Sequence, residues 1–451
     1  MRLSLPRGRA RVLALVLAVP LTGGATAVVL SHESDARADA VAPQPAQRPG
    51  AAGPRPERFS ETSPEERAVQ ALLDARAEAV LSADRAAFLD TVDPGRKGFR
   101  RGQGRLLDAL ADVPLSTWSY ELETGSLATP PGATLADWGD QPRTLDVTFR
   151  YGLRGADADR EGTPRAITFV QRGGRVRIVA DEARDLGGRP QRYVWEEGPV
   201  AFAAGRRSLV LGHPGSRSEL RRLADEVDAA VPRVSAVWGE DWSRRVTVVL
   251  PSTQREFARL TASDADEVAN TAGVAASERP VSRDDVTVAK VFLNPVVLRR
   301  LDAVGRQLLL RHEITHVAAR PSLGTGTPTW LAEGLAEHVA YRGTGFTPRQ
   351  VARTLGPRVR AGRVPDELPT DADLDVEDAR DASAAYEGSW LAVELLVERY
   401  GTAKTVRFFR AVGASDDHST LVLEAELDDV LGTSTKALTK TWRRYLVTSL
   451  G

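Results

Sequence analysis

The stretch that most constrains this chain is His312-Glu313-Ile314-Thr315-His316, an H-E-x-x-H pattern within a run of helical apolar periodicity. On a helix, positions i and i+4 lie on one face about 6 Å apart, so His312 and His316 can direct ring nitrogens at one ion. Glu313 lies one residue further round, where it can take a proton from a metal-bound water. The chain has six histidines and no cysteine, so any metal must bind to His, Asp or Glu. The pattern therefore predicts a metal site on a helix.

A third ligand is needed, because a catalytic zinc is held by three protein groups and keeps one position open for water. Glu333 is the candidate. It lies in the stretch WLAEGLA at 330–336, which begins a second helix after a turn rich in glycine and proline. Glu337 follows four residues later on the same helix face, where it can accept the other ring N–H of a ligating histidine. His338 lacks ligand spacing and is expected at the surface.

These two motifs resemble those of the gluzincin metallopeptidases, the clan of thermolysin and the aminopeptidase N family. The resemblance covers about 208–448, and the two motifs are its specific parts. It implies Zn²⁺ as the cofactor, with His312, His316 and Glu333 as metal ligands and Glu313 as general base and acid. A peptide or protein is the implied substrate.

Further expectations follow from the resemblance. Similar enzymes have a tyrosine in a Y-E-x-G-like helix start that steadies the oxyanion, and Tyr386 in YEGS matches it. The strand around Val286–Asn294 is expected to be the sheet edge that holds an extended substrate by main-chain pairing. The aminopeptidase branch also anchors a free N-terminus with a G-x-M-E-N stretch. Met1 is the only methionine here, so that stretch is absent. An endopeptidase is therefore expected, or a peptidase with one narrow protein substrate at the cell surface.

Two other interpretations use the same residues. One is a membrane-tethered, non-catalytic zinc-containing binding module, for which Glu313→Gln would remove no activity. The other is a zinc hydrolase that acts on something other than a peptide bond, which only a substrate screen separates from a peptidase. Nucleic acid is not an expected partner, since 60 basic and 61 acidic residues leave a net charge of −1.

The first 32 residues have the layout of a signal peptide or signal anchor. Four arginines precede an uncharged run at 12–30, and polar residues follow it. These 19 residues would span about 28 Å as a helix, close to the ~30 Å core of a bilayer. We expect a retained single-pass anchor with the bulk of the chain extracellular, or secretion if the segment is cleaved after Ala27 or Ala40. The Pro- and Ala-rich stretch at 33–59 is expected to be a disordered linker.

The rest of the chain is expected to be α+β in two domains. Residues 60–195 combine helices, the first capped by Ser63, with alternating strands, and resemble in outline the cone-shaped NTF2-like fold. This segment contains no histidine and is expected to be a binding or spacer module. Residues 200–451 form the expected zinc metallopeptidase domain, with a small mixed sheet and a mostly helical C-terminal half.

Overall fold

The computed structural model of this chain describes most of the sequence from Ser63 onward. The described ranges are 63–127, 142–156, 162–183, 192–266, 268–277, 289–324, 326–376, 378–415 and 420–451. The predicted signal or anchor segment at 1–32 and the predicted linker at 33–59 lie outside these ranges. Within them, no helix combines the length and the apolar character that crossing a membrane requires. The expected mixture of helices and sheets is confirmed.

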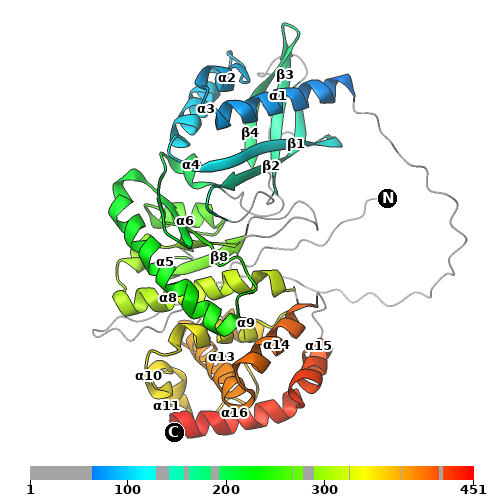
Figure 1. The fold of residues 1–451 in the computed structure, drawn as a ribbon. Coiled ribbons are helices and arrows are strands. Elements are labelled where there is room, and N and C mark those ends of the chain that lie inside the picture. Colours follow the sequence, from blue (N-terminus) through cyan, green and yellow to red (C-terminus); the bar gives the residue numbers. More distant parts are fainter. Residues whose placement is uncertain are drawn as a thin grey trace, which may run out of the picture.

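The N-terminal unit is a four-stranded antiparallel sheet with helices packed on it (Figure 1). Ser63 and Glu66 form the capping box that begins the first helix, as the sequence predicted. The assignment to the NTF2-like fold stays a prediction. The elements are α1 (Pro64–Leu81), α2 (Arg85–Asp90), α3 (Lys97–Ala109), β1 (Leu115–Leu127), β2 (Arg143–Leu153), β3 (Gly162–Arg172) and β4 (Arg175–Ala183).

A mixed five-stranded sheet follows, in the order β5-β6-β7-β9-β8. Its strands are β5 (Ala201–Ala204), β6 (Ser208–Gly212), β7 (Val246–Val249), β8 (Gly273–Ser277) and β9 (Ala289–Leu293). The three central strands are parallel, and β5 and β8 run antiparallel to their neighbours. The expectation that the strand around Val286–Asn294 forms the edge is wrong, because β9 pairs on both sides. The strand at that edge is β8, which was not predicted from the sequence, and β5 forms the other edge.

Helices cover the sheet and make up the C-terminal half. They are α4 (Val194–Glu197), α5 (Arg217–Trp238), α6 (Gln254–Leu260), α7 (Pro295–Leu298), α8 (Ala303–Ala319), α9 (Thr329–Tyr341), α10 (Pro348–Val351), α11 (Leu355–Arg360), α12 (Asp371–Leu374), α13 (Ala379–Tyr400), α14 (Thr402–Gly413), α15 (Thr420–Glu426) and α16 (Thr435–Leu450), with a π-helical turn at Leu427–Leu431 and 3₁₀ turns at Pro214–Ser216 and Arg320–Ser322.

Asp302 caps α8, and Asp378 caps α13. Tyr386 therefore lies two turns inside α13 and not at a helix start.

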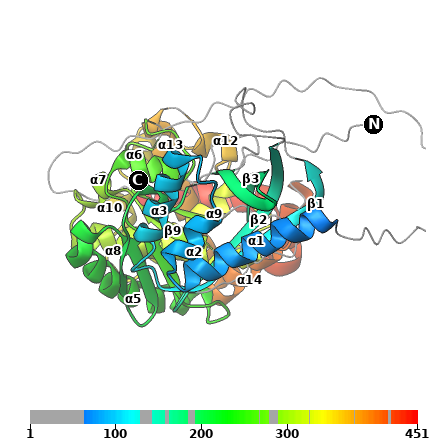
Figure 2. The ribbon, with the colours of Figure 1, turned by 90° about the horizontal axis from the view of Figure 1, so that it is seen from above.

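The five-stranded sheet is buried on both faces, which links the two halves of the molecule. On one face, Val248 and Val291 join the core made with α5, α8 and the C-terminal helices. On the other, Val274 and Phe292 belong to the same hydrophobic cluster as Trp118 of β1. The N-terminal unit thus packs on the back of the sheet, with the C-terminal helices on the opposite side (Figures 1 and 2). The two sheets therefore pack against one shared hydrophobic core. This packing was not predicted from the sequence.

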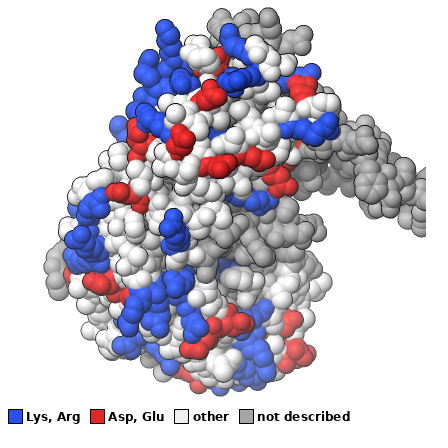
Figure 3. All heavy atoms as spheres, turned by 45° about the horizontal axis from the view of Figure 1, so that its top comes forward, with Lys and Arg blue, Asp and Glu red and all other residues white. Residues whose placement is uncertain are grey.

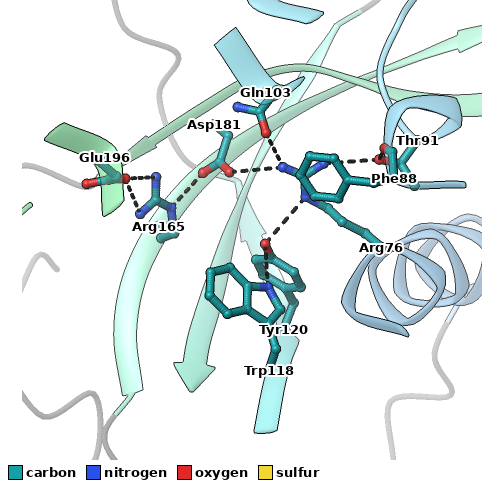
Figure 4. Close-up of polar contacts among 9 residues, drawn as sticks. All are labelled: Arg76, Phe88, Thr91, Gln103, Trp118, Tyr120, Arg165, Asp181 and Glu196. Atoms are coloured by element: carbon teal, nitrogen blue, oxygen red, sulfur yellow. Dashed lines mark hydrogen bonds and ion pairs between the residues drawn. The ribbon is translucent and has the colours of Figure 1, made fainter. Parts of the chain in front are cut away.

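A run of buried charged side chains crosses the N-terminal unit (Figure 4). Arg76 of α1 lies 3.8 Å from Asp181 of β4, and its Nη1 donates to Thr91 at 3.1 Å. Arg165 of β3 donates to Asp181 at 2.6 Å and contacts Glu196 of α4 at 3.3 Å. Positive and negative groups alternate along this run, so each buried charge faces an opposite one.

Surface charge is mixed where it is visible. Figure 3 shows acidic and basic side chains on both units of the face that it draws. Neither unit presents a surface of a single sign there, in keeping with the net charge of −1.

Candidate metal centre

Helices α8 and α9 bring together the three predicted metal ligands. The Nε2 atoms of His312 and His316 lie 3.0 Å apart. Glu333 Oε2 lies 3.3 Å from His312 Nε2, and its Oε1 lies 3.5 Å from His316 Nε2. His312 and Glu333 are almost completely buried, while His316 is partly exposed. Two imidazole nitrogens and a carboxylate therefore converge on one point at the wall of the core.

The spacing of these atoms fits a tetrahedral zinc ion. Ligand atoms 2.0–2.1 Å from a zinc in tetrahedral geometry lie about 3.3 Å apart. The three separations between ligand atoms range from 3.0 to 3.5 Å. Glu333 Oε1 is also a buried oxygen that accepts no hydrogen bond from the described part of the chain, which is costly unless a cation faces it. The donor set and its geometry both suit Zn²⁺.

Glu313 lies beside this cluster and is buried against strand β8. Its Oε1 accepts no hydrogen bond from the described residues, and a β-carbon at Gly273 would lie 3.0 Å from that oxygen. Burial raises the pKa of Glu313 to about 7, although His312, His316 and the N–H of Ala275 act to lower it. A carboxyl with this pKa can both take and return a proton near neutral pH.

The side of β8 that pairs with no strand of the described residues faces Glu313. The N–H of Ala275 is directed at the Glu313 carboxylate and not at β9. In an antiparallel strand, alternate residues present their main-chain groups to the same side. Gly273 and Ala275 therefore present main-chain N–H and C=O groups along the open edge, next to Glu313.

Glu337 lies on the opposite side of the His312 ring from Glu333. Its Oε1 is 3.5 Å from His312 Nδ1, a distance for electrostatic attraction and longer than a good hydrogen bond. Burial acts to lower the pKa of His312, but Glu333 and Glu337 outweigh it and raise that pKa to about 10. Glu333 keeps its charge, since His316 and His312 lower its pKa to about 2 against the effect of burial. Without a metal, His312 is therefore protonated at neutral pH.

Tyr386 comes from α13, which packs on α9. Burial raises the pKa of its phenol, and the nearby carboxylates Glu333, Glu337 and Glu313 raise it further. The phenol thus lies within electrostatic reach of the cluster and stays protonated, as a hydrogen-bond donor must. Its role in the chemistry stays a prediction.

The expectation that His338 lies at the surface is wrong. His338 is buried, and its Nδ1 lies 2.8 Å from Oε1 of Glu394. The reason is that α9 is covered on every side, since each of its residues from Trp330 to Tyr341 is buried. A single amphipathic face would have exposed His338, but the almost continuous apolar composition of WLAEGLAEHVAY was the available signal of a buried helix.

Comparisons with known proteins give structural neighbours only. No family model matches the sequence, and no curated protein does. Among solved structures, an M1 zinc metallopeptidase from Deinococcus radiodurans is similar at 18% identity and TM-score 0.32, with 62% of this chain and 58% of that chain covered. A variant of a two-domain M1 zinc metallopeptidase bound to L-arginine matches at 16% identity and TM-score 0.32, with 62% and 58% covered. Yeast LTA4 hydrolase matches at 12% identity and TM-score 0.36, with 69% and 65% covered. The match thus spans less than two thirds of each of these proteins.

Proposed function

We propose that this protein is a zinc-dependent peptidase of the gluzincin type. The observation that carries the proposal is the convergence of His312, His316 and Glu333 within 4.8 Å of one another, with Glu313 buried next to them. Three protein ligands and an adjacent carboxyl with a pKa of about 7 are what hydrolysis by an activated water requires.

Each residue has a role that its position supports. Bound Zn²⁺ would lower the pKa of water toward neutrality and polarise a carbonyl group. Glu313 would accept the proton of the attacking water at its carboxylate and deliver it to the leaving amine. Tyr386 would donate a hydrogen bond to the oxygen on which negative charge develops. Glu337 would hold the His312 ring with its Nε2 directed at the ion.

We further propose that the substrate is an extended segment of peptide or protein that pairs with the edge of β8. The main-chain groups of Gly273 and Ala275 lie along that edge, beside Glu313. The sequence lacks the G-x-M-E-N stretch with which the aminopeptidase branch anchors a free amino terminus, which supports an endopeptidase. The proposed site of action is outside the cytoplasmic membrane, on the strength of the N-terminal segment at 1–32 alone.

The test is cleavage of a peptide library by the zinc-loaded full-length chain, beside Glu313→Gln. The substitution removes the base but leaves the three ligands in place. We expect one zinc per chain in both proteins and cleavage only in the unsubstituted one, with internal bonds cut. If both proteins hold zinc and neither cuts, the non-catalytic binding module replaces this proposal. Cleavage that survives in the variant would rule out Glu313 as the base.

A further inference from the structure

Helices α9 and α13 approach each other unusually closely at Gly334 and Ser389. A β-carbon at Gly334 would lie 2.4 Å from the main-chain oxygen of Ser389 and 2.7 Å from Cγ2 of Val393. Contact with a main-chain oxygen cannot be relieved by rotating a side chain, so any larger residue would push the helices apart. Ser389 is fully buried, and its hydroxyl donates to Ala385 O within its own helix. Small residues on both helices therefore set the distance between them.

A partly buried polar contact joins the same two helices further along. Oε1 of Glu394 on α13 lies 2.8 Å from Nδ1 of His338 on α9, and it accepts a hydrogen bond of 2.8 Å from Nε1 of Trp390. The Trp390 ring also lies 5.4 Å from the ring of Tyr341, at the end of α9. His338 and Trp390 are both buried. One carboxylate oxygen thus joins a side chain from each helix.

The residues of the proposed reaction flank this crossing. Glu333 directly precedes Gly334, and Tyr386 lies one helical turn before Ser389. Tyr386 lines one small cavity together with Glu337, which lies one turn after Glu333 on α9. Any change in the separation of α9 and α13 must therefore move Tyr386 relative to Glu333.

We propose that the α9–α13 crossing positions Tyr386, with Gly334 and Glu394 as positioning residues. This inference rests on the proposed function, because Tyr386 needs this position only if its phenol donates a hydrogen bond to the oxyanion. Misplacement of such a group by about 1 Å can cost on the order of 100-fold in rate. Neither Gly334 nor Glu394 touches the substrate in this scheme.

The first experiment compares three variants of the zinc-loaded full-length chain on fluorescein-labelled casein. Glu394→Ala removes the shared acceptor, and we expect kcat to fall roughly tenfold with KM within about twofold. Glu394→Gln retains an oxygen that can accept from both rings, so it restores the rate. Glu398→Ala is the matched control, because Glu398 lies one turn further along α13 and accepts from Tyr445 of α16 instead. An equal loss in Glu398→Ala would overturn the proposal.

A double-mutant cycle with Tyr386→Phe separates positioning from general damage. If Glu394 acts through Tyr386, Glu394→Ala changes the rate less than about twofold once the phenol is gone. The same tenfold loss in both backgrounds would show that Glu394 acts by another route. Gly334→Ala should likewise lower the rate only when Tyr386 is present. If Gly334→Ala does not fold, the Glu394 variants alone test the proposal.

Binding of a small zinc ligand, measured without substrate, shows whether this inference fails or the proposed function fails. Acetohydroxamate, an anionic ligand for protein-bound zinc, presents an oxygen where Tyr386 would donate. We expect Glu394→Ala and Tyr386→Phe each to weaken its binding, with no further loss in the double variant and with zinc affinity unchanged within about threefold. If casein is not cut but this pattern holds, the positioning inference stands and the peptidase assignment falls. Binding unchanged in Glu394→Ala overturns the inference.

Discussion

Gly273 borders the carboxylate of Glu313 so closely that a β-carbon there would lie 3.0 Å from Oε1 and 3.2 Å from Cδ. The edge strand β8 and the proposed base are therefore in direct contact. Because Glu313 is buried, its side chain has little room to move away from a new methyl group.

We expect Gly273→Ala to lower kcat by tenfold or more, since it displaces the general base while the three proposed metal ligands stay in place. Gly98→Ala is the control, because Gly98 lies on α3 with no atom within 4 Å of a new β-carbon. The measurement is hydrolysis of labelled casein with zinc content determined in parallel. If kcat is unchanged in Gly273→Ala, the present position of the Glu313 carboxylate is not required for hydrolysis.

Helices α8 and α9 could be predicted because their signals are local. The H-E-x-x-H spacing, the 3.6-residue period and the cap residue Asp302 all lie within α8 or directly before it. The pairing of Glu333 with the two histidines was expected from the motif and is seen in the geometry. His338 was mispredicted because burial on all sides of α9 depends on α13, which follows some 40 residues later in the sequence.

Strand β8 was missed for a different physical reason. Its sequence GVAAS has one β-branched residue and no alternation of polar and apolar side chains. It is held as a strand by pairing with β9 and by packing of Val274 into the core of the N-terminal unit. Such long-range contacts leave no short-range pattern, so neither the edge strand nor the core shared by the two sheets could be read from the sequence.

Zinc binding should release a proton from His312, whose pKa is raised to about 10 by Glu333 and Glu337 despite burial. A ligand with a pKa above the working pH must lose its proton to bind metal, so apparent zinc affinity should rise as pH increases toward 10. Glu337→Gln removes one of the two carboxylates, lowers the pKa of His312 and reduces the number of protons released.

Calorimetry at pH 8 in buffers of different ionisation enthalpy counts these protons. Protons lost from bound water are common to both proteins, so the difference between the wild type and Glu337→Gln reports His312. We expect up to about one proton more from the wild type, since His312 is almost fully protonated at pH 8 before zinc binds. Glu398→Gln, remote from the site, should match the wild type. Equal proton release from wild type and Glu337→Gln would show that Glu337 does not act on His312.

The stability of the N-terminal unit should depend on Asp181 more than on any surface carboxylate. Asp181 is 5% exposed at its side chain and lies between two buried guanidinium groups, Arg76 and Arg165 (Figure 4). Asp181→Asn keeps the shape but leaves these charges without their shared partner, for which we expect a loss of about 3–5 kcal/mol in the free energy of unfolding. Asp108→Asn is the control, because its partner Arg85 is half exposed and such pairs contribute little.

Urea unfolding followed by circular dichroism measures both variants. Similar midpoints for the two would show that Arg76 and Arg165 are satisfied without Asp181, through Gln103, Thr91 and Glu196.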